Sequence, residues 1–164
     1  MFGRTGLLCL ALYAAQPALA ANWLTFGGDP QRTGWAQDEK DIDRNNVKNL
    51  TLLWKASLDN EPRELNSLTA PVAAEWVVTQ NGMKEIVVVG GASDNLFALD
   101  AENGKVLWKK TFTAQGNSRQ NPSWLCPGAL NATPLIGKTG LELRVYAISS
   151  DGKLHVLDIH NQNR

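Results

Sequence analysis

A repeated set of short apolar runs constrains the fold of this chain more than any other feature. Four runs, each compatible with a β-strand, occupy residues 72–79, 86–89, 96–99 and 106–112. Three turn signals separate them, at residues 80–82 (QNG), 93–95 (SDN) and 100–104 (DAENG). Asn, Asp and Gly are favoured at such positions because they tolerate the backbone conformations of tight turns, including positive φ. The segment therefore predicts a four-stranded antiparallel sheet within about forty residues.

The strand pattern restarts further along the chain. Residues 132–135 (ATPL) echo residues 69–72 (TAPV), residues 145–149 echo 86–89, and residues 150–158 (SDGKLHVLD) echo 93–100 (SDNLFALD) with one residue more. Asp158 lies 58 positions after Asp100. An earlier run, residues 50–58 (LTLLWKASL), matches the run around Trp108, and its Trp54 lies 54 positions before that tryptophan. Repeats of this length with four strands each are typical of β-propeller blades.

The second repeat is shorter than the first. Six residues (IHNQNR) follow Asp158, so this repeat has three strands and no counterpart of the Trp108 strand. A propeller holds roughly four to eight blades. We therefore expect an all-β fold, a partial β-propeller with one full four-stranded blade, one partial blade and a leading strand at 50–58. The expected organisation is a signal peptide (1–20), an N-terminal arm or loop (21–49) that ends near a helical turn, and incomplete propeller repeats (50–164).

The first twenty residues have the pattern of a secretory signal peptide. Arg4 supplies the positive charge, residues 7–15 are apolar, and residues 18–20 (ALA) form a small-x-small cleavage site. A buried N-terminal helix is the alternative interpretation. The apolar run is too short to span a bilayer. We therefore expect a periplasmic or secreted bacterial protein that has no transmembrane segment after signal removal.

The charge balance argues against nucleic acid as a partner. Basic and acidic residues number 16 each, and removal of Arg4 leaves 15 basic and 16 acidic residues, a formal charge of −1. Proteins that bind nucleic acid by its phosphates carry a basic field. We expect no nucleic-acid binding.

One local motif recurs in the strand pattern. Its members are Ala98, Asp100, Gly104 and Trp108, and its counterparts in the neighbouring repeats are Trp54 and Asp158. Asp100 can accept hydrogen bonds from turn amides, and Gly104 can supply the positive φ that ends the turn. Trp108 is large enough to fill the gap between neighbouring blades, with its indole N–H bonded to a carbonyl. We assign these residues to the structural repeat and none of them to catalysis.

Residues 98–108 (ALDAENGKVLW) resemble the tryptophan-docking repeat of pyrroloquinoline quinone (PQQ) propellers, with Asn103 where that family usually has Thr. Residues 23–32 (WLTFGGDPQR), followed by Ile42, Asn46 and Leu50, resemble the opening segment of PQQ-dependent alcohol dehydrogenases. The resemblance implies a quinone on the propeller axis with Ca²⁺, an Asp base, a Glu and an Asn that hold the metal, and often a disulfide between adjacent cysteines. Most of these groups would come from later blades.

Cys126 is the one position in this chain that can be compared with that site. It lies near the place of the cysteine pair, but Pro127 follows it, so no such disulfide can form. Cys9 would leave with the signal peptide. Cys126 is therefore a weak candidate for cofactor binding, and a buried apolar thiol is the alternative. His155 and His160 lack a Cys or carboxylate cluster that would complete a metal site, so we assign no metal ligand and no catalytic residue.

Two functions remain open for the parent protein. The resemblance implies a quinoprotein-like oxidoreductase that oxidises a small alcohol or sugar with PQQ and Ca²⁺, since the cofactor carries the chemistry. The alternative is a non-catalytic propeller that acts as a binding or assembly scaffold for envelope proteins. For the present 164 residues alone we expect no bound cofactor and no turnover.

Overall fold

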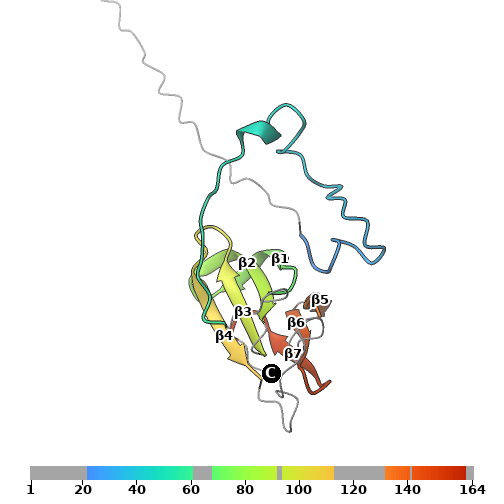
Figure 1. The fold of residues 1–164 in the computed structure, drawn as a ribbon, viewed down its shortest axis with the longest axis vertical. Helices are drawn as coiled ribbons and strands as arrows, with labels where there is room; N and C mark the ends of the chain where they lie inside the picture. The colour runs from blue at the N-terminus through green and yellow to red at the C-terminus, as the bar shows by residue number, and fades with distance from the viewer. Residues whose placement is uncertain (1–21, 61–67, 92–93, 113–131, 141, 162–164) are drawn as a thin grey trace, which may run out of the picture.

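Two antiparallel sheets make up the folded part of the chain (Figure 1). The computed structural model describes residues 22–60, 68–91, 94–112, 132–140 and 142–161. The first sheet contains, in spatial order, β1 (Val72–Thr79), β2 (Gly82–Gly91), β3 (Asn95–Asp100) and β4 (Val106–Thr111). The second contains β5 (Leu135–Thr139), β6 (Glu142–Ile148) and β7 (Leu154–Asp158). The predicted all-β fold, with one four-stranded and one three-stranded repeat, is confirmed.

Strand alternation divides the first sheet into two apolar faces. In β2, Ile86 and Val88 have no exposed surface and belong to one cluster of buried side chains, while Val89 belongs to another. In β3, Leu96 belongs to the first cluster and Phe97 to the second. Successive side chains of a strand point to opposite faces. Both faces of the first sheet therefore need other parts of the protein packed against them, as expected of a propeller blade with a neighbouring blade on each side.

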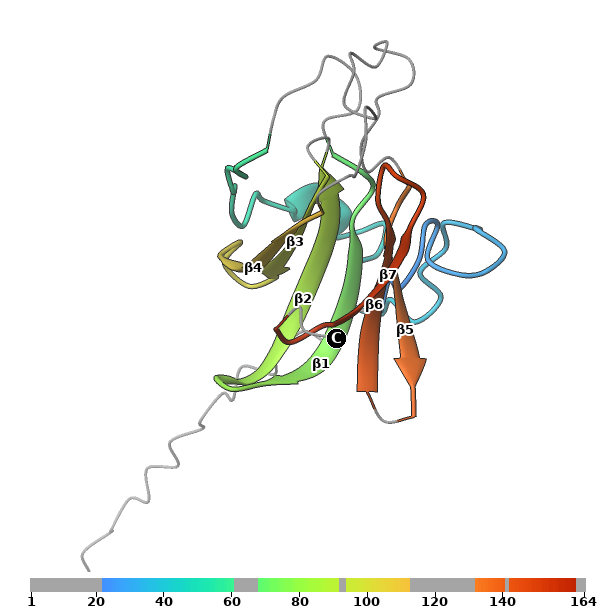
Figure 2. The same cartoon turned by 90° about the horizontal axis from the view of Figure 1, so that it is seen from below.

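The main core lies between the two sheets. Strands β5, β6 and β7 pack against the first sheet beside β1 and β2 (Figure 2). The buried side chains that meet there are Val72, Ala74, Val77, Ile86, Val88, Leu96, Ala98, Trp108, Phe112, Ile136, Val145, Ala147, Leu157 and Ile159. Burial of apolar area of this kind is the largest favourable contribution to folding. The two repeats therefore stabilise each other.

Residues 22–24 join the inner edges of both sheets. The backbone of Trp23 pairs with Ala73 of β1 through hydrogen bonds of 2.9 and 2.8 Å, and the amide of Ile136 in β5 donates to the carbonyl oxygen of Leu24 at 2.8 Å. The side chain of Leu24 packs against the main core. The start of the arm thus takes part in the fold instead of lying free of it.

The short helical turn expected near residue 47 is present as η1, a 3₁₀ helix (Val47–Asn49). It is neither long nor apolar enough to cross a membrane, and no other helix occurs among the described residues. Residues 1–21, which include the expected signal peptide, lie outside the described residues.

The leading strand expected at 50–58 needs correction. Residues 51–60 form no strand pairing in the structure. The apolar pattern of this segment is real, because Ala56 and Leu58 pack against Val89, Phe97 and Leu99. A strand is defined by backbone pairing with a neighbour, and no described strand pairs with this segment. It is extended chain that is anchored by side chains such as Trp54, Ala56 and Leu58, and by the Asp59 carbonyl, which accepts a hydrogen bond of 3.0 Å from Lys109 Nζ.

Candidate functional site

Trp108 joins the two sheets at the end of the four-stranded repeat. It lies in β4, opposite Ala98 of β3, and its side chain is buried. The indole Nε1 donates a hydrogen bond of 2.7 Å to the carbonyl oxygen of Ile159, directly after β7. A buried indole N–H needs such a partner. The contact therefore fixes the fourth strand of one repeat to the final turn of the next.

Trp54 makes the same kind of contact one repeat earlier. Its indole Nε1 donates to the carbonyl oxygen of Ala101, also at 2.7 Å. Ala101 follows Asp100 as Ile159 follows Asp158, so the two acceptors hold equivalent positions. Gly104 has a φ of 71°, and a Cβ at this position would overlap the Trp54 ring. The turn thus needs glycine for its backbone and for the approach of the indole.

Asp100 stabilises the turn that receives Trp54. Its carboxylate forms an ion pair of 2.9 Å with Lys84 and accepts a hydrogen bond of 3.0 Å from the amide of Glu102. Burial raises the pKa of Asp100, but the Lys84 ammonium and the Glu102 amide outweigh burial and leave the pKa below its usual value. The side chain is almost fully buried. The carboxylate is therefore bound to structural partners.

Asp158 has a comparable position at the end of β7. Its carboxylate accepts a hydrogen bond of 2.8 Å from the amide of His160 and lies 3.6 Å from Arg144. Each aspartate therefore caps its turn by accepting the amide two residues further along the chain. Asp100 and Asp158, which hold equivalent positions in the two repeats, therefore make equivalent hydrogen bonds.

A second contact between the repeats involves Asp94, a residue that the sequence marked only as part of a turn. Asp94 is 2% exposed and adopts a positive φ of 56°. Its carboxylate accepts hydrogen bonds from the amide of Ser150, at 3.0 Å, and from the Ser150 hydroxyl. Both turns contain a Ser-Asp pair, at 93–94 and at 150–151. That repetition is the only signal that could have suggested a link.

Ser149 and His155 form a polar cluster next to this contact. The hydroxyl of Ser149 lies 2.8 Å from Nε2 of His155 and also bonds Asp151. The His155 ring stacks on Phe112 with centroids 4.0 Å apart. A catalytic triad needs the carboxylate to orient the imidazole, whereas here the carboxylate bonds the serine. The contacts of Ser149 with Asp151 and His155 hold the β6–β7 turn.

Asp151 is the most strongly shifted acid of the described residues. Lys153 binds its carboxylate at 2.6 Å, and together with the Ser149 hydroxyl it lowers the pKa of Asp151 to about 2. The group therefore stays ionised at any physiological pH. It can accept hydrogen bonds but cannot serve as a proton donor there.

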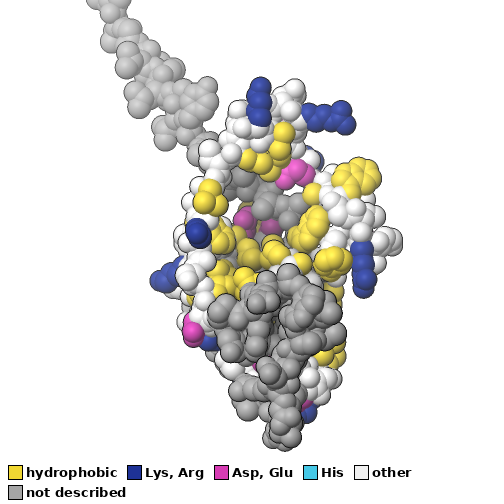
Figure 3. Space-filling view, viewed as in Figure 1, with side chains coloured by type: hydrophobic (Ala, Val, Ile, Leu, Met, Phe, Trp, Pro, Cys, Tyr) yellow, Lys and Arg dark blue, Asp and Glu magenta, His cyan; other side chains and the backbone are white. Residues whose placement is uncertain are grey.

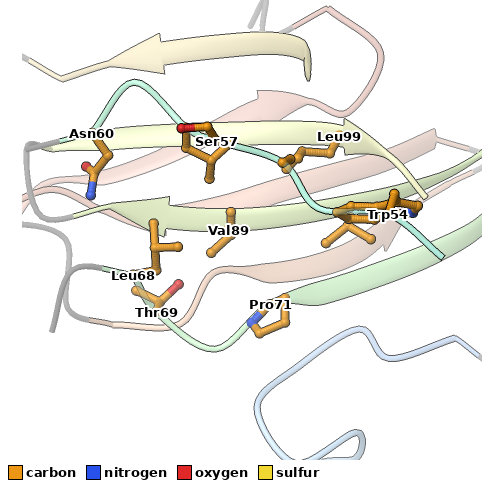
Figure 4. A pocket seen from close by; sticks show the side chains of 11 residues that line it. Trp54, Ser57, Asn60, Leu68, Thr69, Pro71, Val89 and Leu99 are labelled. Atoms are coloured by element: carbon orange, nitrogen blue, oxygen red, sulfur yellow. The ribbon is translucent and has the colours of Figure 1, made fainter. Parts of the chain in front are cut away.

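An apolar groove lies between the 50–60 segment and the first sheet. Its volume is about 470 Å³. Eleven residues line it: Trp54, Ala56, Ser57, Leu58, Asn60, Leu68, Thr69, Pro71, Val87, Val89 and Leu99. Figure 4 shows the segment that carries Trp54 and Asn60 passing over the strands that carry Val89 and Leu99. We call the side of the first sheet that carries Val87, Val89 and Leu99 the groove face.

The second sheet has an apolar face without cover among the described residues. Leu154 is 63% exposed and Val156 is 38% exposed, and they lie opposite Ile148 and Tyr146 in the register of β6 and β7. Residues directly opposite in an antiparallel pair point to the same side. We call the side of the second sheet that carries Tyr146, Ile148, Leu154 and Val156 the open face.

The described residues do not fit a quinone–calcium site. They contain no group of three or more His, Cys, Asp or Glu side chains that could hold a metal ion. The buried carboxylates of Asp94 and Asp100 are bound to Ser150 and Lys84. Cys126, the candidate from the sequence, lies outside the described residues.

The fold and its contacts define a class, that of all-β repeat proteins whose blades are linked by tryptophan side chains. A family model described as "Outer membrane protein assembly factor BamB" matches residues 30–164. The chain belongs to this family of PQQ-type repeats. The resemblance noted in the repeat motif is thereby confirmed.

Two known proteins show how far the similarity extends. Lupanine 17-hydroxylase [cytochrome c] from a Pseudomonas species is 27% identical over 124 residues, which cover 71% of this chain and 16% of the hydroxylase. The crystal structure of BamB from Moraxella catarrhalis has a TM-score of 0.42 and 19% identity, and the match covers 68% of this chain and 26% of that one. The chain therefore spans well under a third of either protein.

Proposed function

We propose that this chain forms blades of a propeller that binds other proteins in the periplasm or cell envelope, as a binding or assembly scaffold. One observation carries the proposal. The buried carboxylates are bound within or between the repeats, whereas large apolar side chains stay exposed. Leu52 is 82% exposed, Leu53 77% and Trp35 68%. Exposed apolar groups in such number are typical of surfaces that meet a protein partner.

The distribution of hydrophobic side chains on one face of the molecule supports the same conclusion. Figure 3 shows hydrophobic side chains gathered around a hollow on one side of the molecule. The family description names the assembly of outer-membrane proteins, and unfolded strands of such proteins alternate apolar and polar side chains. Open sheet edges and apolar faces can receive strands of this kind. We therefore propose envelope proteins with exposed strands as the partner class.

A direct test uses an unfolded outer-membrane β-barrel polypeptide as the probe. The polypeptide is diluted out of urea with and without the chain, and light scattering follows its aggregation. We expect the chain to slow aggregation, and we expect Leu52→Ser with Leu53→Ser to weaken the effect. Met83→Ser is the matched control, because Met83 is exposed on β2. An unchanged scattering curve in the presence of the wild-type chain would exclude the scaffold proposal.

A second candidate is a quinoprotein-type oxidoreductase acting on an alcohol or sugar. The similarity to lupanine 17-hydroxylase favours it. In that case the whole protein would take up PQQ with Ca²⁺, and a change in quinone absorbance would report the uptake. Dye reduction with a panel of alcohols and sugars would then report turnover. For the present chain we expect neither signal, and dye reduction by the purified chain would reverse the order of the two candidates.

A further inference from the structure

His155 lies in the contact between the two sheets and is the titratable ring of that contact among the described residues. It is in β7, opposite Ala147 of β6. Its ring stacks on Phe112, the residue after β4, with centroids 4.0 Å apart and planes inclined by 26°. Phe112 is 4% exposed, and its amide donates a hydrogen bond of 2.8 Å to the carbonyl oxygen of Asp94. The imidazole of the second sheet therefore contacts a side chain of the first sheet that is itself held in place.

The hydrogen bonds of Ser149 determine which nitrogen of His155 carries a proton. The Asp151 carboxylate is ionised, since its pKa is about 2, and an ionised carboxylate only accepts hydrogen bonds. The Ser149 hydroxyl has one proton, which it donates to Asp151, and the Lys153 carbonyl oxygen, 3.4 Å away, is likewise only an acceptor. The Ser149 oxygen must therefore accept a hydrogen bond from Nε2 of His155, at 2.8 Å. Nε2 is thus protonated, both in the neutral ring and in the imidazolium ion.

Two carboxylates and one aromatic ring near His155 favour a second proton on the imidazole. Asp151 lies on the other side of the Ser149 hydroxyl. The Asp94 carboxylate reaches the same β6–β7 turn from the first sheet and accepts a hydrogen bond of 3.0 Å from an amide of that turn. Opposite charges nearby favour the charged form of a titratable group. The face of the Phe112 ring adds to this, because the face of an aromatic ring attracts a cation.

Two effects oppose the second proton. Lys153 is the basic residue of the β6–β7 turn, but it is bound to Asp151 at 2.6 Å and its side chain is 61% exposed, so water screens its charge. Burial disfavours the imidazolium ion, but His155 is only partly buried. We therefore expect the carboxylates and the aromatic face to outweigh both effects.

We propose that His155 makes the contact between the two repeats dependent on pH, because its imidazolium ion donates to Ser149 and stacks on Phe112 more favourably than the neutral ring does. The hydrogen bond from Nε2 to Ser149 exists in both forms. The second proton therefore strengthens a contact that is already formed and requires no rearrangement. All the groups involved lie where the two sheets meet. The effect is thus independent of which other parts of the protein cover the outer faces of these repeats, and of the partner proposed above.

The direction of the pH dependence follows from linkage between proton binding and folding. A histidine that binds its proton more tightly in the folded chain than in the unfolded chain stabilises the fold fully below its unfolded pKa, about 6.5. This stabilisation is lost as the pH rises through the folded pKa. Each unit by which the folded pKa exceeds the unfolded one multiplies the folding equilibrium constant by about ten. The contact between the repeats should therefore be stronger at about pH 5.5 than at about pH 8.

The first measurement is an NMR titration of the imidazole. The sequence contains two histidines, so His160→Gln leaves the signals of His155 alone. We expect nitrogen chemical shifts that show a proton on Nε2 at high pH and a titrating Nδ1, with a midpoint above about pH 6.5. Ser149→Ala and Asp151→Asn should each lower that midpoint. Glu142→Gln, at an exposed carboxylate at the start of β6, is the matched control and should leave it unchanged.

Two results of this titration would overturn the proposal. One is a neutral ring that carries its proton on Nδ1, because Ser149 would then have to donate to His155. The other is a midpoint at or below that of His155 in the urea-unfolded chain, because protonation would then not strengthen the contact.

The second measurement is the urea midpoint of unfolding between about pH 5.5 and pH 8, a range in which the acid with the pKa of about 2, Asp151, stays ionised. We expect the wild-type midpoint to rise as the pH falls. His155→Gln should remove the rise, because its amide can still donate to Ser149 but cannot gain a charge. His160→Gln is the matched control and should keep the rise. A wild-type midpoint that does not rise, or a His155→Gln variant with the same rise, would contradict the proposal.

Discussion

The indole Nε1 of Trp108 donates a hydrogen bond of 2.7 Å to the carbonyl oxygen of Ile159, 51 residues further along the chain. This bond connects the last strand of the first sheet to the turn that ends the second. Trp54 and Ala101 repeat it at the same distance one repeat earlier. The two tryptophans thus link successive repeats. Their substitution should lower the free energy of unfolding more than it disturbs the strands of either sheet.

Substitution of Trp108 should destabilise the contact between the sheets. Trp108→Phe keeps most of the buried ring but removes the donor and leaves the Ile159 carbonyl without its partner. We expect a loss of about 1–3 kcal/mol in the free energy of unfolding, measured by urea titration. Trp76→Phe should change it by less than about 0.5 kcal/mol, since Trp76 is largely exposed. Equal effects of the two variants would contradict this role of Trp108.

Substitution of Gly104 separates backbone strain from steric overlap. Gly104→Ala forces a side chain into the left-handed region and into the ring of Trp54. Gly140 has a φ of 65° with no atom within 4 Å of a Cβ, so Gly140→Ala should show the strain alone, about 1–2 kcal/mol. We expect the Gly104 variant to lose more stability and to change tryptophan fluorescence. Matching losses and an unchanged spectrum would mean that Trp54 does not rest on Gly104.

Asp94 offers a test of the second contact between the repeats. Asp94→Ala removes the acceptor of the Ser150 amide and hydroxyl and should cost about 1–3 kcal/mol. Asp94→Asn should cost less, because Asn tolerates the same positive φ and keeps one acceptor oxygen. Urea unfolding of the two variants gives the comparison. An Asn variant as unstable as the Ala variant would show that the charge, and not the geometry, is required.

Acid should weaken the fold through two aspartates. The pKa values of Asp100 and Asp151 lie below the unfolded value of 3.8 in the folded chain, and that of Asp151 is about 2. The unfolded chain therefore binds protons first as the pH falls, so the stabilisation is complete above about pH 4 and is lost toward pH 2. Urea midpoints across this range should decrease. Asp151→Asn should flatten the slope, and a wild-type midpoint independent of pH would refute the assignment.

Much of the fold could be predicted because each repeat has a strong local pattern. Strand β1 has the bounds expected from its β-branched run. Strand β2 begins earlier than expected, at Gly82, because backbone pairing with β1 continues through its exposed first residues. These first residues of β2 do not form an apolar run in the sequence, so the sequence alone does not show that they belong to a strand. The order of strands along the first sheet follows the chain, as short hairpin turns require.

The contacts between repeats were less accessible to prediction. Asp94 and Ser150 are both turn residues, and the Ser-Asp pair that both turns share shows their repeat relation but not that the two turns meet. The apolar pattern at 50–58 indicates that alternate side chains are partly buried, but not which strand, if any, pairs with the backbone. The groove could not be predicted for the same reason. Its existence depends on the distance between the 50–60 segment and the first sheet, which only the tertiary structure gives.

The sequence by itself determined the blade as a unit, because strand alternation, turn residues and tryptophan spacing are all local properties of the chain. It also predicted that the Trp108 side chain would fill the gap between neighbouring blades, with its indole N–H bonded to a carbonyl. The tertiary structure decided which faces of the sheets are covered and which stay open. That outcome depends on the relative placement of segments more than fifty residues apart, such as Trp108 and Ile159, and no local pattern records it.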